Sequence, residues 1–415
     1  MRYSLWSLLR QGLRDHRDWP PAWREAEPRP AYDVLVLGGG GHGLATAYYL
    51  ATLHGITRVA VLEKGWIGGG NTGRNTTVVR SNYYYPESAG IYDFALSLYE
   101  GLSAELGFNI MLSQRGSCFL AHSPADLDHF RRFVNAMRVN GVDAELLDRR
   151  GVAELMPLLD MSAEARFPVH GGLVQRRGGI ARHDAVAWGY ARGAAAAGVD
   201  IVQNCEVTGF LREGGRVVGV ETSRGRIAAG AVAMTVAGHS GVLSARAGFR
   251  LPITSYALQA FVSEPLKPVL DTVVLSPATG TYLSQSDKGE LVIGGGLDLY
   301  PSYAQRGNLP TIQTVTAGLL ELFPAFARVK LLRSWAGIVD VVHDSSPIIG
   351  PAPVEGLWLN CGWGTGGFKA IPAGGWLLAH LVATGRHHPL SRPFDLDRFA
   401  RGALIDEAAA AGISH

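Results

Sequence analysis

Uniformly apolar runs alternate with glycine-rich turns near the start of the chain. Residues 34–37 are all apolar and are followed at once by five glycines within residues 38–43, which predicts a buried parallel strand ending in a tight turn. Residues 44–53 are alanine-rich with helical periodicity, and residues 59–62 repeat the buried-strand pattern. These segments predict one βαβ unit.

The same kinds of element recur later in the sequence. A helix is predicted over residues 185–197, with Asp184 as its N-cap and Gly198 as its C-terminal stop, and a strand follows over residues 201–203. Apolar residues 357–359 lead again into a glycine-rich turn. The nucleotide-binding domain is therefore expected to be assembled from separated segments.

Two stretches follow a different pattern. Residues 253–263 and 281–296 alternate apolar and polar positions, which favours half-exposed antiparallel strands. We therefore expect a second domain that contains a β-sheet. Gly294–Gly296 is followed by Leu297 and Asp298 within this β pattern, so no second dinucleotide fingerprint is evident.

Composition places the chain among globular proteins. It has 415 residues, of which 47% are hydrophobic and 18% charged, enough for two domains with a large core. Its 38 Lys and Arg against 36 Asp and Glu give a formal charge of +2, so a nucleic-acid partner is not expected. No apolar stretch approaches the length of a membrane span, and no membrane association is expected.

Cysteine usage indicates the cytoplasm. Cys118, Cys205 and Cys361 are odd in number and far apart, so they predict neither a disulfide framework nor a zinc site. We expect no metal in the protein.

Residues 1–30 differ from the rest of the chain. Trp6, Trp19 and Trp23 alternate with charged residues, which is typical of an arm and not of a core element. Two interpretations remain open here: a loosely packed extension, and a contact with another subunit.

The first glycine turn has the spacing of a dinucleotide-binding fingerprint. Gly38 and Gly40 let the turn form and a pyrophosphate approach, while Gly43 lets helix and strand pack closely. Glu63, twenty residues after Gly43, is an acid that could bind a ribose diol. A dinucleotide is therefore the predicted ligand.

A second glycine turn distinguishes between the possible dinucleotides. It spans residues 68–70 and continues through Asn71, Thr72, Asn75 and Thr76. An extended FAD needs several such loops, whereas a nicotinamide cofactor does not need one here. We therefore expect FAD.

Several motifs recur in a characteristic order along nearly the whole sequence. They are the glycine fingerprint with Glu63 and Lys64, and residues 70–80, 175–179, 182–184, 237–240, 344–350, 363–369 and 402–407. In this order the chain resembles the D-amino-acid oxidase-like flavoenzymes and, more narrowly, the beta subunits of heterotetrameric sarcosine oxidases.

The resemblance implies two flavins. FAD would be bound non-covalently, with Val207 at the adenine and the final glycines facing the flavin pyrimidine ring. The residues expected at FAD are Gly38, Gly40, Gly41, His42, Gly43, Glu63, Lys64, Asn71, Thr72, Asn75, Thr76, Val207, Gly364, Gly366, Gly367 and Lys369.

The second flavin, FMN, would be attached covalently to His183. The residues alone leave two interpretations open: a histidine near a bound phosphate at the positive end of a helix, or a surface histidine beside the N-cap. His170 is the rival position, and we expect it to be a variable turn residue.

Two basic residues are the candidates for substrate binding. Arg80 and Lys369 each follow a ligand-binding turn, where a cation can fix the carboxylate of an amino acid. The resemblance assigns both to the substrate carboxylate. A single Arg or Lys taken alone is more often a solvated side chain, and it is the position after ligand-binding turns that favours the binding role. Asp340, His343, Asp344 and His239 could serve either acid–base chemistry or turns and caps, and we assign none of them as a base.

The implied reaction is the oxidative demethylation of sarcosine, or a similar N-methyl amino acid, to glycine and formaldehyde. Electrons would pass from FAD to FMN and then to oxygen, giving hydrogen peroxide. Alpha, gamma and delta subunits would complete the heterotetramer. Two alternatives are an FAD-only amine dehydrogenase of the dimethylglycine or proline type, and a flavin-stabilised assembly subunit.

The predicted fold is α/β, with a Rossmann-like FAD-binding domain interleaved with a β-sheet-containing substrate domain. The expected boundaries are an arm at 1–30, an FAD-binding domain at 31–105, 170–250 and 335–400, a substrate domain at 106–169 and 251–334, and a tail at 401–415.

Overall fold

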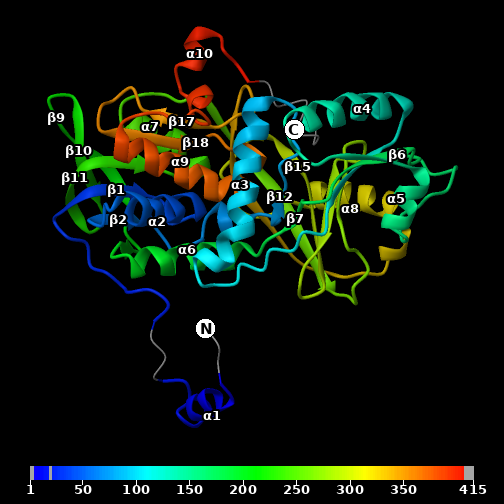
Figure 1. The fold of residues 1–415 in the computed structure, drawn as a ribbon, viewed down its shortest axis with the longest axis horizontal. Helices are drawn as coiled ribbons and strands as arrows, with labels where there is room; N and C mark the ends of the chain where they lie inside the picture. Colours follow the sequence, from blue (N-terminus) through cyan, green and yellow to red (C-terminus); the bar gives the residue numbers. More distant parts are fainter. Residues whose placement is uncertain (1–3, 18–20, 406–415) are drawn as a thin grey trace.

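The computed structural model describes residues 4–17 and 21–405. These residues fold around two large sheets that lie side by side, with helices packed on their outer faces (Figure 1). Trp19 and residues 406–415 of the expected tail lie outside the described residues.

The first sheet has eight strands and a parallel centre. The strand order along its main path is β17 (Ile348–Pro351), β18 (Leu357–Cys361), β11 (Gly225–Met234), β1 (Ala31–Leu37), β2 (Val59–Leu62) and β8 (Asp200–Val202). Two further strands branch from this path: β10 (Arg216–Thr222) pairs with β11, and β9 (Val207–Glu213) pairs with β10. The strands from β18 to β8 are mutually parallel. The strands predicted at 34–37, 59–62, 201–203 and 357–359 are confirmed, with small shifts at their ends.

Both faces of this sheet are buried, which explains its uniformly apolar strands. Val34 and Val36 pack beneath the helices α2 (Gly41–His54), α6 (His183–Ala196) and α9 (Ile371–Thr384). Leu35 and Leu37 face the opposite side, toward β9, β10 and the helix α7 (Ser240–Arg246). Alternating residues thus enter two different cores.

The N-cap predicted for α6 is wrong. The helix begins at His183, and Asp184 lies within its first turn. The Asp184 carboxylate pairs with Arg182 (Nε–Oδ1 3.0 Å) and accepts from the Ala185 amide (2.8 Å), so it does not cap the helix from outside. The predicted stop at Gly198 is confirmed.

The second sheet is largely antiparallel, as predicted. Its order is β16 (Leu331–Val342), β12 (Ile253–Pro265), β15 (Glu290–Pro301), β14 (Thr281–Gln285), β13 (Val273–Ser276), β4 (Ser117–Ala121), β6 (Gly171–Gln175), β5 (Glu145–Asp148). The helices beside it are α4 (Pro124–Val139), α5 (Arg149–Leu155) and α8 (Leu309–Leu322). The long helix α3 (Pro86–Glu105) runs along the first sheet's helical layer and contacts α9.

The prediction that these strands are half-exposed is wrong for β14. Every residue of β14 is buried, because Leu283 enters the core beneath α8 while Tyr282 enters the cluster on the other face. β6 and β16 also belong to this sheet, although we expected 170–250 and 335–400 in the FAD-binding domain. Sheet membership alone does not assign domains, so the domain boundaries stay predictions.

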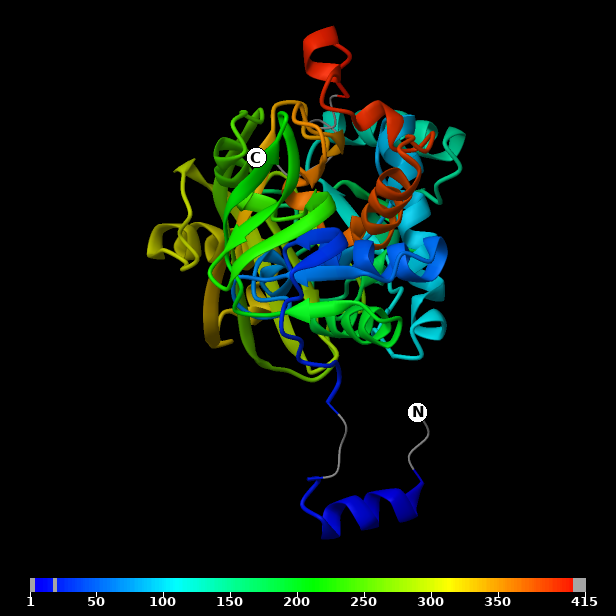
Figure 2. The same cartoon turned by 90° about the vertical axis from the view of Figure 1, so that its left-hand side faces the viewer.

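The N-terminal arm has two parts. The helix α1 (Leu5–Leu13) has no buried residue and stands away from the body in Figures 1 and 2. Farther along, Trp23 packs against the first core, and Arg24 and Arg29 form ion pairs with the buried Asp200. The arm is thus fastened at its C-terminal part, and both interpretations of α1 stay open.

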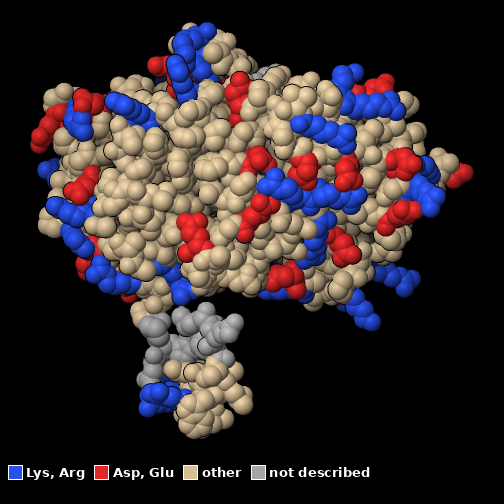
Figure 3. All heavy atoms as spheres, viewed as in Figure 1, with Lys and Arg blue, Asp and Glu red and all other residues tan. Residues whose placement is uncertain are grey.

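Charged side chains are interspersed on the surface. Lys and Arg lie among Asp and Glu on the face drawn in Figure 3, in keeping with the small formal charge. Within residues 4–17 and 21–405, none of the helices combines the length and apolar character that a membrane crossing requires.

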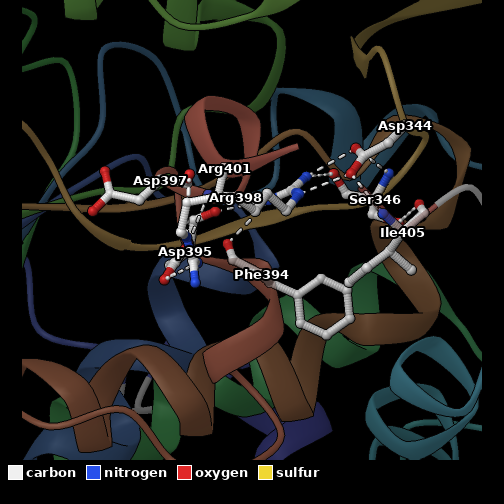
Figure 4. A network of polar contacts seen from close by, with 8 residues as sticks. All are labelled: Asp344, Ser346, Phe394, Asp395, Asp397, Arg398, Arg401 and Ile405. Carbon is white, nitrogen blue, oxygen red and sulfur yellow. Dashed lines mark hydrogen bonds and ion pairs between the residues drawn. The ribbon is translucent and has the colours of Figure 1, made fainter. Parts of the chain in front are cut away.

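A buried ion pair fastens the C-terminal segment to the turn between β16 and β17 (Figure 4). The guanidinium of Arg398 donates to both carboxylate oxygens of Asp344 (2.8 and 2.9 Å) and to the Ser346 carbonyl (2.9 Å). Both charged side chains are fully buried, and the Ile405 amide also donates to Asp344 (3.2 Å). Asp344 therefore has a structural role and not an acid–base one.

Replacing Arg398 with methionine is expected to lower the free energy of unfolding by about 3–5 kcal/mol, because the Asp344 carboxylate would stay buried without its partner. Urea unfolding of the flavin-loaded protein measures this. The double variant Arg398→Met/Asp344→Leu should recover part of the loss. A single variant as stable as the parent would contradict this role.

Candidate flavin and substrate site

A cavity of about 430 Å³ runs past the carboxyl ends of β1 and β2 and reaches the second sheet. Leu37 and Leu62 line it from the first sheet, and Leu258 and Tyr282 from the second. Crevices at the carboxyl ends of parallel strands are the usual ligand sites of open α/β sheets.

The first glycine turn has the geometry that a diphosphate requires. Gly38 has φ +105°, and a Cβ on Gly43 would lie 2.0 Å from the Gly38 carbonyl oxygen. Gly38, Gly40 and Gly41 line the cavity at the N-terminus of α2. Gly43 does not line it and instead allows close packing of helix and strand, the role expected for the third glycine.

Glu63 lies at the end of β2, facing the cavity. Its carboxylate accepts from the amides of Gly39 and Gly65, both at 2.8 Å. Lys64 also lines the cavity, with its Nζ 3.2 Å from Nε2 of His239, and so does Val207. Ribose and adenine contacts by these residues stay predictions.

Asparagines of the second glycine turn fasten it in place. Asn71 accepts from the Ile338 amide (2.8 Å) and donates to its carbonyl, and Asn75 accepts from the Thr77 amide (2.6 Å). Thr72 accepts from the Gly41 amide (2.9 Å), which joins the two glycine turns. All three residues line the cavity with Thr76, but the sequence did not reveal these backbone contacts.

The last glycine turn closes the cavity near β18. Gly364 and Gly367 line it, whereas Gly366 does not and packs against Tyr92. His42 of the first turn reaches the Gly367 carbonyl (Nε2–O 2.8 Å), and burial lowers the pKa of His42 to about 4. The neutral imidazole of His42 thus links the first and last glycine turns. The sequence did not predict this link.

Arg80 and Lys369 meet at the cavity wall. Both are buried and line the cavity, and the Tyr83 ring lies 4.9 Å from the Arg80 guanidinium and 6.0 Å from the Lys369 ammonium. Burial, and then the neighbouring Arg80 charge, hold the pKa of Lys369 well below its usual value. Two buried cations side by side favour an anionic ligand.

Residues 33–381 match the family described as FAD dependent oxidoreductase. The chain belongs to this family. The match confirms FAD as the cofactor of this oxidoreductase, and the glycine turns that line the cavity fit it.

Close relatives of this FAD-dependent oxidoreductase share its full length. "Sarcosine oxidase subunit beta" of Rhizobium meliloti is 58% identical over 98% of each chain, and that of Rhodobacter capsulatus is 54% identical over 100% of each. Among solved structures, L-proline dehydrogenase from P. horikoshii has a TM-score of 0.85 and 29% identity, covering 91% of this chain and 100% of its own. Glycine oxidase from Geobacillus kaustophilus shares the fold (TM-score 0.78, 24% identity, covering 89% and 99%).

His183 lies outside the FAD cavity of the oxidoreductase, at the first position of α6. Its Nδ1 is buried and has no hydrogen-bond partner among the described residues. Burial lowers the pKa of His183. The Asp184 carboxylate raises this pKa, and the charges of Arg182, Lys288 and Arg333 lower it. A neutral imidazole with a free nitrogen, close to three cations, fits a covalently attached phosphate-bearing group. His170, by contrast, is exposed at the start of β6.

Proposed function

We propose that this FAD-dependent oxidoreductase oxidises the N-methyl group of sarcosine, or of a similar N-methyl amino acid. Sarcosine, oxygen and water would give glycine, formaldehyde and hydrogen peroxide. The pair of buried cations, Arg80 and Lys369, at the FAD cavity carries this proposal. The identity of 54–58% to proteins named sarcosine oxidase subunit beta supports the choice of substrate.

The residues of the chain would bind and orient the substrate. Arg80 and Lys369 hold its carboxylate, which directs the methylated nitrogen toward the flavin end of the cavity. Leu258, Leu275 and Tyr282 line the cavity from the second sheet and limit the access of water. When bound, FAD supplies the acceptor for the two electrons and the hydrogen removed from carbon.

We also propose that His183 carries FMN. Its free Nδ1 and the adjacent cations Arg182, Lys288 and Arg333 support this assignment. FMN would supply the route of electrons to oxygen. Partner subunits of the alpha, gamma and delta kinds would complete a cytoplasmic heterotetramer.

Flavin mapping and product analysis test the proposal together. The chain is co-expressed with its partner subunits and denatured in acid, and any retained flavin is located by peptide mass. We expect FMN on the peptide containing His183, free FAD, and equal amounts of formaldehyde and hydrogen peroxide from sarcosine. Release of all flavin as FAD, with no peroxide formed, would instead identify an FAD-only amine dehydrogenase.

The affinity for a carboxylate ligand should fall as the pH rises. We expect this fall at a lower pH than the pH at which an exposed lysine would lose its proton. The ammonium of Lys369 attracts the carboxylate. Because the pKa of Lys369 is lowered, this ammonium becomes a neutral amine at a lower pH than an ordinary lysine does. Methoxyacetate, which has no amine to titrate, can be followed by the change in flavin absorbance. Lys369→Arg should remove this pH dependence, and an unchanged profile in that variant would contradict the assignment.

A further inference from the structure

A buried carboxylate lies beneath the turn that carries the last glycines. Asp340, near the end of β16, is 2% exposed and lines the FAD cavity. Its Oδ2 accepts from the Gly362 amide at 2.5 Å. Asp340 was one of four residues left without a role by the sequence.

The backbone of the turn is shaped to surround this carboxylate. Gly362 (φ +72°) and Gly364 (φ +51°) are left-handed, and Trp363 between them is right-handed. Alternation of this kind makes successive amides converge on one point, which forms an anion-binding nest. Burial raises the pKa of Asp340 to about 6, although hydrogen bonds from Gly362, Trp363 and Gly364 favour the ionised form. The anion in this nest is thus a side chain of the protein itself.

The same turn carries groups that face the ligands. Gly364 and Gly367 line the cavity, and the Lys369 ammonium donates to the Thr365 carbonyl (3.3 Å). Asn71 holds the neighbouring Ile338 of β16 to the second glycine turn. Asp340 therefore lies where β16 ties the last turn to the rest of the flavin site.

We propose that Asp340 is a positioning residue for FAD, whose carboxylate fills the amide nest of residues 362–364 and fixes the turn against the cofactor. The negative charge is essential, because a charge-assisted bond holds several amides at once. The charge also acts on Cys361 of β18, since it adds to burial in raising the pKa of that thiol. The inference goes beyond the proposed function, because it concerns FAD binding and not the amine substrate.

FAD titration of the apoprotein tests the proposal, with Asp340→Asn as the main variant. This variant keeps an oxygen acceptor and loses the charge, so we expect FAD binding to weaken about tenfold and the visible spectrum of bound flavin to change. Asp340→Ala, which removes the acceptor as well, should bind FAD more weakly still. The melting temperature of each apoprotein is measured in parallel.

Asp298→Asn provides the matched control. Asp298 is also buried and accepts from Gln259 (2.6 Å) and Asn308 (3.1 Å), but it does not line the cavity. The Asp298→Asn variant should bind FAD with the affinity of the parent protein. Parental affinity and spectrum in Asp340→Asn would overturn the proposal, and so would an equal loss of affinity in Asp298→Asn. Neither result depends on sarcosine turnover, so failure here is distinguishable from failure of the proposed function.

Discussion

Replacing Arg80 with alanine is expected to lower kcat/KM for sarcosine about a thousandfold while FAD stays bound. Arg80 is buried at the cavity wall, where its guanidinium lies over the rings of Tyr83 (4.9 Å) and Phe119 (5.3 Å). Removing one partner of a buried, hydrogen-bonded charge pair costs about 2–5 kcal/mol, and a thousandfold change corresponds to about 4 kcal/mol. Steady-state kinetics and the flavin content of the purified variant measure the two effects.

Arg192→Ala is the matched control for this variant. Arg192 lies 4.9 Å over the Phe108 ring, the same separation as Arg80 over Tyr83, but outside the cavity. Its replacement should leave kcat/KM unchanged. If Arg80→Ala retained full turnover with FAD bound, the chain would be a flavin-stabilised assembly subunit and the chemistry would lie in a partner.

The parallel sheet could be predicted because its physical cause is local. Strands buried on both faces must be apolar at every position, and residues 34–37 and 59–62 show this without any knowledge of the fold. The β14 strand shows the limit of the approach. Its alternation of Tyr282, Leu283 and Ser284 suggested one exposed face, but Tyr282 and Ser284, which share that face, are both buried. That face packs into a cluster with Phe119 of β4 and Phe130 of α4, which are distant along the chain and meet β14 only in the tertiary structure.

The site could be predicted where a residue type is tied to a backbone conformation. Gly38 and Gly43 are required by the turn itself, and the structure shows the close contact that excludes a side chain at Gly43. The roles of Asn71 and Asp340 could not be predicted, because each depends on a segment more than twenty residues away along the chain. The predicted cap at Asp184 failed for a local reason, because the helix begins one residue earlier and the carboxylate pairs with the nearby Arg182.

Replacing His183 with alanine is expected to abolish covalent flavin completely, because the imidazole nitrogen is the atom that would form the bond. FAD binding should persist, since His183 does not line the FAD cavity. Acid precipitation followed by absorbance of the pellet and supernatant separates the two flavins.

The consequences of this variant distinguish the two-flavin enzyme from a one-flavin dehydrogenase. Sarcosine should still reduce FAD in a single turnover. The steady-state rate of peroxide production should fall to a small fraction of the parent rate, because the route to oxygen is missing. His170→Ala, at an exposed position just before β6, should retain covalent flavin and full turnover. Retention of covalent flavin in His183→Ala would show that another residue carries it, and undiminished peroxide production without covalent flavin would show that oxygen reacts at the FAD itself.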